Sequence, residues 1–215
     1  MKKDFEKYLK SKVGTKYTHM QSKYVNFHGA DSDLITSNVF DKLLKERIII
    51  LSGELDPYLC EFAKSSILYM ESIDNESDIT LYINSPGGSV YDGLGLLDIM
   101  DYVKPDISTI NTGLAASMGA IILTSGCKGK RKSLKRSRVM IHQPLGYGGY
   151  IQQASDMEIE AKEINHVKKE LYEIISNTTG QPYDRVWNDS DRDYWMNSEQ
   201  AKEYGMIDEI LIKRT

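Results

Sequence analysis

The sequence predicts an α/β protein in which helices cover a parallel β-sheet. Two observations support this class. Short runs rich in β-branched residues alternate with longer segments whose apolar residues recur at helical spacing, and the strand-like runs end in turns of small residues. Parallel strands need helical crossovers, so the turns at their carboxyl ends meet at one edge of the sheet, where ligands and catalytic groups gather. We therefore expect the functional site at these turns.

Three strand–helix units follow one another after a short basic helix over residues 42–47. Their strands are expected at residues 48–51, 79–84 and 107–112. The first helix starts at Asp56, a capping residue followed by proline at the first helical position. The second starts at Val90, after a Pro-Gly-Gly turn, and the third at Ser117. This order of elements predicts a sheet with helical crossovers.

The second half of the chain contains a basic run, a strand, a long helix and a final helix–strand pair. The basic run, 128–138, is interpreted as a solvated surface hairpin or as a patch that docks an anion or partner. A strand over 139–144 contains His142, and a helix from about 152 to 179 is ended by Gly180. That helix would be roughly 40 Å long, so it either projects and joins subunits or simply covers the sheet. A helix at 199–204 and a strand at 206–212 end the pattern.

Residues 1–38 show no sustained hydrophobic period, which favours a flexible or processed leader before a folded domain at 39–215. The chain has 215 residues, with 27 Lys and Arg against 31 Asp and Glu, so its charge gives no reason to expect nucleic acid or an anionic membrane as partner. It shows neither a signal-type apolar segment nor an apolar run long enough to span a bilayer. Cys60 and Cys127 lack metal-type spacing, which favours reduced thiols. We expect a cytoplasmic location.

Ser117 lies among small residues at a predicted strand-to-helix junction. Such a junction can expose the hydroxyl while neighbouring backbone N–H groups converge beside it. Alternatively, the small residues only let a buried helix pack closely. A serine nucleophile needs an imidazole to take its proton and a carboxylate to orient that imidazole. His142 follows 25 positions later, and the carboxylate is left open among Asp189, Asp191 and Asp193. Backbone N–H groups of Gly88 and Met118 could bind an oxyanion.

Three segments, 82–88, 113–120 and 138–144, closely resemble the signature segments of the ClpP family, the peptidase subunits of the caseinolytic (Clp) protease, peptidase family S14. Further similarity extends in order over roughly residues 40–215. The resemblance implies a crotonase-like spiral of ββα units with a protruding handle helix. It also implies that Ser117 is the nucleophile and His142 the general base. The position of the triad acid falls on Asp193, with Asp189 as the second choice, and the oxyanion donors fall on Gly88 and Met118.

The same resemblance implies an assembly and its partners. Two heptameric rings would stack through the handle helix, and Asp191 and Arg192 match the pair that links ring contact to catalytic geometry. Unfolded protein substrates would be threaded in by an AAA+ unfoldase such as ClpX, ClpA or ClpC. ATP then belongs to that partner, and the chain itself needs no cofactor or metal. The ATPase-docking pocket matches Leu68, Tyr82, Tyr102 and Leu211.

This sequence departs from the family pattern in three places, one of which is the segment 146–153 before the handle helix, about two residues longer than usual. Thr80 and Lys132 stand where aromatic residues are common in the docking pocket, which implies a weaker or different ATPase contact. The axial-loop pattern of the family is not recognisable in residues 20–38.

Three functional hypotheses follow. The first is a serine endopeptidase, favoured because Ser117, His142 and Asp193 are all present. The second is a non-catalytic or accessory ring subunit that needs a second subunit for activity. The third is a crotonase-fold enzyme acting on acyl-CoA, which shares the oxyanion site but relies on acidic catalysts.

Overall fold

The computed structural model describes residues 32–146 and 153–213, and the chain divides into two units after Glu46. In the first unit it describes helix α3 (Ser32–Lys45). This helix starts ten residues before the expected helix 42–47, inside the expected leader 1–38, and Glu46 and Arg47 lie outside it. The rest of the leader, residues 1–31, lies outside the described residues.

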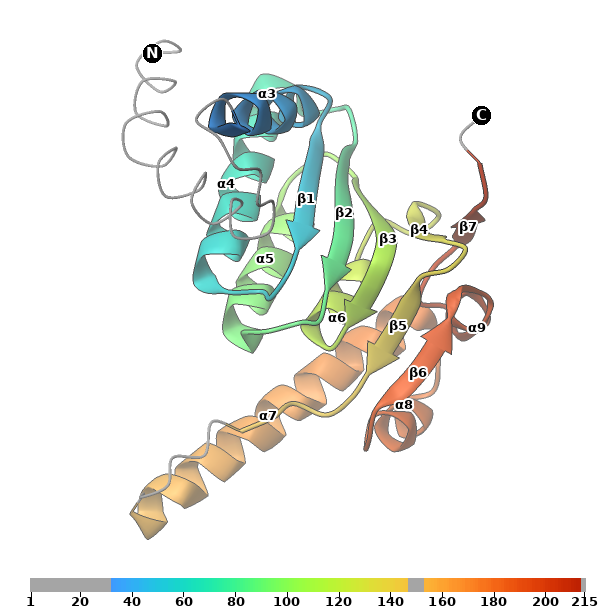
Figure 1. Cartoon of the computed structure of the whole chain (residues 1–215). Coiled ribbons are helices and arrows are strands. Elements are labelled where there is room, and N and C mark those ends of the chain that lie inside the picture. Colours follow the sequence, from blue (N-terminus) through green and yellow to red (C-terminus); the bar gives the residue numbers. More distant parts are fainter. Residues whose placement is uncertain (1–31, 147–152, 214–215) are drawn as a thin grey trace. The chain divides into compact units, whose positions relative to one another are not determined.

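The second unit contains a mixed sheet whose main part is parallel (Figure 1). Its strand order is β1 (Ile48–Ser52), β2 (Ile79–Ser85), β3 (Ile107–Ala116), β4 (Arg131–Leu134) and β7 (Glu209–Leu211). Strand β5 (Arg138–Ile141) pairs in parallel with the end of β3, and β6 (Tyr194–Asn197) pairs antiparallel with β5. The three strands expected first are present, and β3 continues four residues further than expected and ends at Ala116, directly before Ser117.

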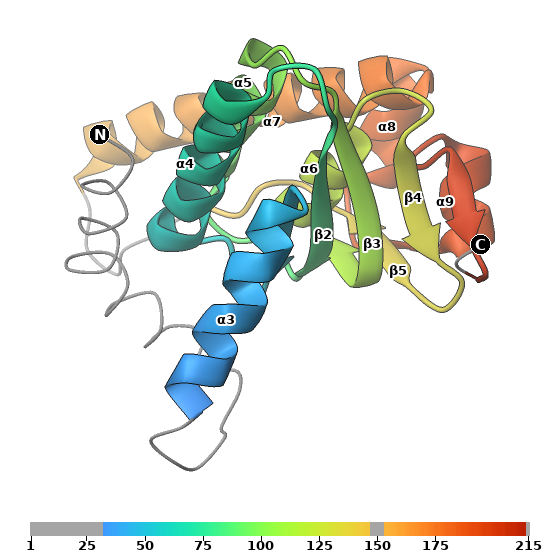
Figure 2. The same cartoon turned by 90° about the horizontal axis from the view of Figure 1, so that it is seen from above.

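Helices α4 (Pro57–Ile73), α5 (Val90–Tyr102) and α6 (Met118–Thr124) lie on one face of this sheet (Figure 2). Asp56 caps α4 as expected, because its carboxylate accepts from the Leu59 N–H. Alternate residues of β2 are buried, whereas Thr80 and Tyr82, which belong to the other face of the strand, are only partly buried. All seven residues of α6 are buried, so the helix that follows Ser117 is fixed by the core.

Helix α7 (Ala154–Thr179) is the expected long helix, and its first half extends beyond the sheet (Figure 1). The expected start near residue 152 lies outside the described residues. Gly180 ends α7 in the left-handed conformation, as expected for a helix C-cap. A short helix that the sequence analysis did not predict, α8 (Tyr183–Asp189), comes next, and α9 (Ser198–Tyr204) precedes β7. The fold is therefore α/β with a protruding helix, as the sequence predicted.

The interpretation of residues 128–138 as a solvated hairpin is wrong. Strands β4 and β5 do not pair with each other; both pair with β3, first at residues 109–111 and then at 114–116. Part of the basic run is also neutralised by ion pairs at the surface, because Lys130 binds the carboxylates of Asp78 and Asp106. Arg131 is only 1% exposed. The final strand is likewise shorter than the expected range 206–212.

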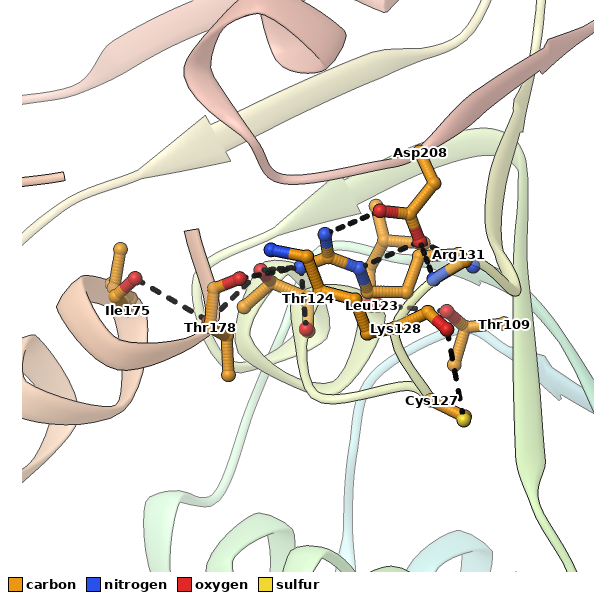
Figure 3. A network of polar contacts seen from close by, with 10 residues as sticks. Thr109, Leu123, Thr124, Cys127, Lys128, Arg131, Ile175, Thr178 and Asp208 are labelled. Carbon is orange, nitrogen blue, oxygen red and sulfur yellow. Dashed lines mark hydrogen bonds and ion pairs between the residues drawn. The ribbon is translucent and has the colours of Figure 1, made fainter. Parts of the chain in front are cut away.

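Buried Arg131 joins the ends of two helices (Figure 3). Its guanidinium binds both carboxylate oxygens of Asp208, at 2.6 and 3.0 Å. The remaining nitrogen, Nη1, donates to the carbonyl oxygens of Thr124 at 3.2 Å and Thr178 at 2.8 Å. These carbonyls belong to the last turns of α6 and α7, which lack intrahelical donors and carry partial negative charge. A single cation therefore stabilises the C-termini of both helices.

The Arg131–Asp208 pair predicts a particular loss of stability in acid. Burial raises the pKa of Asp208, but hydrogen bonds and charge from Arg131 outweigh burial and hold that pKa below its usual range. The stabilisation is therefore complete above about pH 4, the unfolded value, and is lost as the pH falls through the lower folded-state pKa. We expect the unfolding temperature of the wild type to fall more steeply below pH 4 than that of Asp208→Asn.

Thermal unfolding followed by circular dichroism between pH 7 and pH 3 measures this difference. The matched control is Glu209→Gln, which removes the neighbouring but more exposed pair with Lys132 and should leave the acid slope close to the wild type's. If the unfolding temperature of the wild type and that of Asp208→Asn fall equally steeply below pH 4, the Arg131–Asp208 pair is not the source of the acid sensitivity.

Candidate active site

Ser117 lies at the junction between β3 and α6, in a strained backbone conformation. Its φ of +55° is in the left-handed region that side-chain-bearing residues rarely adopt. The residue occupies the N-cap position of α6, yet its hydroxyl accepts no capping hydrogen bond. Instead, its Oγ lies 2.8 Å from Nε2 of His142. The strained junction thus directs the hydroxyl away from the helix and toward an imidazole, a geometry similar to the nucleophile elbow of α/β-hydrolases.

The pairing of β5 with β3 brings His142 to this position. Ala116 is paired with Met140, and the Ser117 N–H donates to the Met140 carbonyl oxygen at 2.8 Å. His142 follows Met140 by two residues and its side chain is 17% exposed. The imidazole is therefore placed by the sheet itself.

The pairing of β5 with β6 brings an aspartate to the other side of the imidazole. Ile141 is paired with Tyr194, so the residues just outside this antiparallel pair, His142 and Asp193, face each other. His142 Nδ1 lies 3.4 Å from Asp193 Oδ1, which is long for a hydrogen bond, and catalytic hydrogen bonds commonly tighten in the substrate complex.

Asp189 has a different place. It is the last residue of α8, and its carboxylate forms an ion pair with Arg185 at 3.4 Å. Sequence spacing alone could not decide whether Asp189 or Asp193 lies beside His142, because this depends on the pairing of β6 with β5.

The turn after β2 lies against Ser117. A Cβ atom added to Gly87 would come within 2.7 Å of the Ser117 Cβ, so only glycine allows this approach. Gly88 forms a bridge with Leu55, whose N–H and carbonyl bind Gly87 and Ser89. Within the described ranges, the backbone N–H groups of Gly88 and Met118 donate to no protein acceptor. They remain available beside the serine, which suits donors for an oxyanion.

Two contacts hold the segment that carries Asp193. The Tyr172 hydroxyl donates to the Ser190 carbonyl oxygen at 3.1 Å, and Gln143 Nε2 donates to the Asp191 carbonyl oxygen at 2.7 Å. Burial raises the pKa of Tyr172 to about 12, so its hydroxyl remains a donor at neutral pH. The sequence analysis missed both residues, and only the position of Gln143 directly after His142 could have indicated a role. The side chains of Asp191 and Arg192 are exposed.

The residues expected to form a docking pocket fall into two groups. Tyr82 lies on the less covered sheet face, in one register row with Lys132 and Glu209, and Leu211 lies on that face further along β7. Lys132 Nζ is 3.2 Å from the Glu209 carboxylate. Leu68 and Tyr102 are exposed on α4 and α5, at the opposite side of the sheet. This chain alone therefore does not bring the four residues into one pocket.

Other kinds of site find little support in the described residues. They contain no group of three or more His, Cys, Asp or Glu side chains arranged to hold a metal ion. None of their helices combines the length and apolar character needed to cross a membrane. Cys60 and Cys127 are free thiols, and burial raises the pKa of Cys60 to about 12, which makes it a poor nucleophile.

Comparisons with known proteins agree with this geometry. A family model described as Clp protease matches residues 31–214. The chain is 54% identical over 177 residues to an ATP-dependent Clp protease proteolytic subunit of Bacteroides fragilis, covering 82% of this chain and 84% of the relative. A protein of the same name from Porphyromonas gingivalis is 48% identical over 219 residues and covers 98% of both chains.

A third relative, ATP-dependent Clp protease proteolytic subunit 2 of Parasynechococcus marenigrum, is 51% identical over 177 residues, which cover 82% of this chain and 89% of the relative. These matches confirm the resemblance that segments 82–88, 113–120 and 138–144 indicated. Family model, relatives and fold lead to one conclusion: the chain belongs to the Clp protease family.

Proposed function

We propose that this chain is the proteolytic subunit of a Clp protease and hydrolyses peptide bonds of unfolded proteins with Ser117 as nucleophile. The observation that carries the proposal is the 2.8 Å contact between Ser117 Oγ and His142 Nε2, made by a serine whose hydroxyl is not used as a helix cap. Family membership and the names of the relatives point to the same activity.

The reaction begins when His142 takes the Ser117 proton and Oγ attacks the carbonyl carbon of the peptide bond. The N–H groups of Gly88 and Met118 bind the oxyanion that forms, each contributing about 3 kcal/mol in comparable sites. The protonated His142 then gives its proton to the leaving amine, so the C–N bond breaks and an acyl-enzyme remains. A water molecule, deprotonated by His142, hydrolyses this ester and restores the serine.

Asp193 holds His142 in the productive tautomer. Its Oδ1 faces Nδ1, so the proton stays on Nδ1 and Nε2 is free to accept from Ser117. The carboxylate also stabilises the imidazolium that forms during attack. Since all three members of the triad lie together, catalysis by this chain is favoured over the accessory-subunit hypothesis. Family membership favours peptide over acyl-CoA as substrate.

For the assembly, we propose two stacked heptameric rings joined through α7, with no resident metal or cofactor and a cytoplasmic location. On the projecting half of α7, the apolar residues Met157 and Ile159 are 57% and 65% exposed. This favours a contact between this half of the helix and another subunit over full exposure to solvent. Asp191 and Arg192 are exposed beside the site, and contact between the rings would change the position of Asp193 through them. The relatives are named subunits of an ATP-dependent protease, which supports an AAA+ ATPase as the partner that consumes ATP.

The ATPase would dock between neighbouring subunits, where Leu68 and Tyr102 of one copy meet the sheet face of the next. On that face the Lys132–Glu209 pair lies in the same row as Tyr82. Covering this pair with an apolar loop removes water from two charges, which weakens an otherwise hydrophobic contact.

The first prediction concerns the nucleophile. The purified protein should react with a fluorophosphonate at one site per subunit, and Ser117→Ala should abolish the adduct because it removes the attacking hydroxyl. Intact mass spectrometry measures the adduct, and native mass spectrometry of the same sample measures the assembly. A complete double ring that does not react would contradict the proposal and favour the accessory-subunit hypothesis.

The second prediction separates the two aspartates. Asp193→Asn should lower kcat/KM for a fluorogenic peptide on the order of 10³-fold, because the imidazole loses its orienting carboxylate. Asp189→Asn is the matched control and should change kcat/KM only a few-fold, since Asp189 pairs with Arg185. A larger loss in Asp189→Asn than in Asp193→Asn would reverse the assignment of the triad acid.

The third prediction concerns ATPase docking. Lys132→Glu places two like charges side by side with Glu209 and should weaken binding of a ClpX-type ATPase to the assembled protein by about tenfold or more. Lys135→Glu, a nearby exposed charge reversal outside the Tyr82 row, serves as the control. Affinity is measured by biolayer interferometry. If Lys132→Glu still binds the ATPase strongly, the Lys132–Glu209 pair does not weaken the ATPase contact, and this part of the proposal is wrong.

A further inference from the structure

The position of Asp193 depends on the backbone that precedes it. Its side chain is 59% exposed, and in the described part of the chain the structure shows one ion-pair contact for it, the 3.4 Å approach to His142. A carboxylate this exposed is not fixed by packing. Its orientation therefore rests on the loop 190–193 between α8 and β6, and on whatever holds that loop.

Gln143 is the side chain that ties this loop to the imidazole. It directly follows His142, and its Nε2 donates to the carbonyl oxygen of Asp191 at 2.7 Å, two residues before Asp193. Its Oε1 accepts from Lys168 Nζ at 3.4 Å. An ammonium group can only donate and a carbonyl oxygen can only accept, so the two neighbours allow one orientation of the amide. Lys168 thus sets which way Gln143 points.

Lys168 is itself held by aromatic rings at the junction of α7 and α8. Its ammonium lies 4.3 Å from the ring centroid of Trp187 and 5.5 Å from that of Tyr172. The two rings meet edge to face at 5.4 Å. Tyr172 then binds the Ser190 carbonyl oxygen, a second tether on the same loop. Tyr172 and Lys168, which contacts Gln143, lie one turn apart on α7.

We propose that Gln143, oriented by Lys168 of helix α7, is a positioning residue that holds the triad acid Asp193 against His142. Tyr172 supports the same loop from the other end. The contacts that connect α7 to the catalytic centre therefore pass through the side-chain amide of Gln143, which directly follows His142. This inference rests on the proposed function, because it assigns a role within the triad.

The test uses substitutions that keep size and remove single donors. Gln143→Glu is isosteric and keeps its contact with Lys168, but it places a carboxylate oxygen against the Asp191 carbonyl. Lys168→Met keeps the aliphatic stem over Trp187 and removes the ammonium. Lys169→Met, at the adjacent exposed position of α7, is the matched control. Native mass spectrometry checks that each variant assembles like the wild type.

We expect Gln143→Glu to lower kcat for a fluorogenic peptide by about 10- to 100-fold with little change in KM, because substrate contacts are intact while the acid is misplaced. The rate of fluorophosphonate labelling should fall by a similar factor. Lys168→Met should give a smaller loss of the same kind, and Lys169→Met none. A wild-type rate in Gln143→Glu, or an effect on KM alone, would overturn the proposal.

A second measurement separates positioning from a general structural role. In an Asp193→Ala background there is no acid left to place, so adding Gln143→Glu should change the labelling rate less than about twofold. If the full loss persists in that background, Gln143 acts in some other way. Failure of the proposed function would look different, since the wild type itself would then not be labelled at Ser117.

Discussion

Strand β5 connects the three chemical groups of the candidate site because it pairs with β3 on one side and with β6 on the other. The parallel register to β3 brings His142 to Ser117, and the antiparallel register to β6 brings Asp193 to His142. A shift of one residue in the β5–β3 pairing would turn the imidazole away from Ser117, and the same shift in the β5–β6 pairing would turn Asp193 away from His142. The geometry of the candidate site is therefore set mainly by backbone hydrogen bonds between strands far apart in the sequence.

The buried Arg131–Asp208 ion pair also stabilises this arrangement, at the far end of α6. Helix α6 follows Ser117 and ends at Thr124, where the guanidinium of Arg131 binds its last carbonyl oxygen. Asp208 balances that cation and also accepts from the Gly129 N–H. Truncating one partner of such a pair leaves an uncompensated charge in the core, typically at a cost of about 3–5 kcal/mol. The helix that follows the strained Ser117 is thus fixed at both ends, by the Ser117 N–H bond to Met140 at its start and by Arg131 at its end.

Much of this arrangement could be predicted from the sequence. Alternating apolar patterns predicted the first three strand–helix units, and the small residues around Ser117 indicated a sharp junction. Long-range pairing escaped such reasoning. Nothing local to residues 131–141 shows that β4 and β5 both join β3, so a run of basic residues was interpreted as a hairpin although Arg131 is buried. The same limit applied to Asp193 and Asp189, since their relation to His142 is decided by a strand register.

Ser117 and Asp193, at the two ends of the candidate site, differ in how firmly the structure holds them. Moving Ser117 would require disrupting a helix that is buried along its whole length, a change close to global unfolding in free energy. Moving Asp193 requires breaking a few hydrogen bonds of the loop 190–193, of which residues 191–193 are exposed, each contributing about 1 kcal/mol. Local opening of residues 190–193 would therefore separate Asp193 from His142 while Ser117 stays in place. Hydrogen exchange in this protein should accordingly be slow around α6 and much faster in the loop before β6.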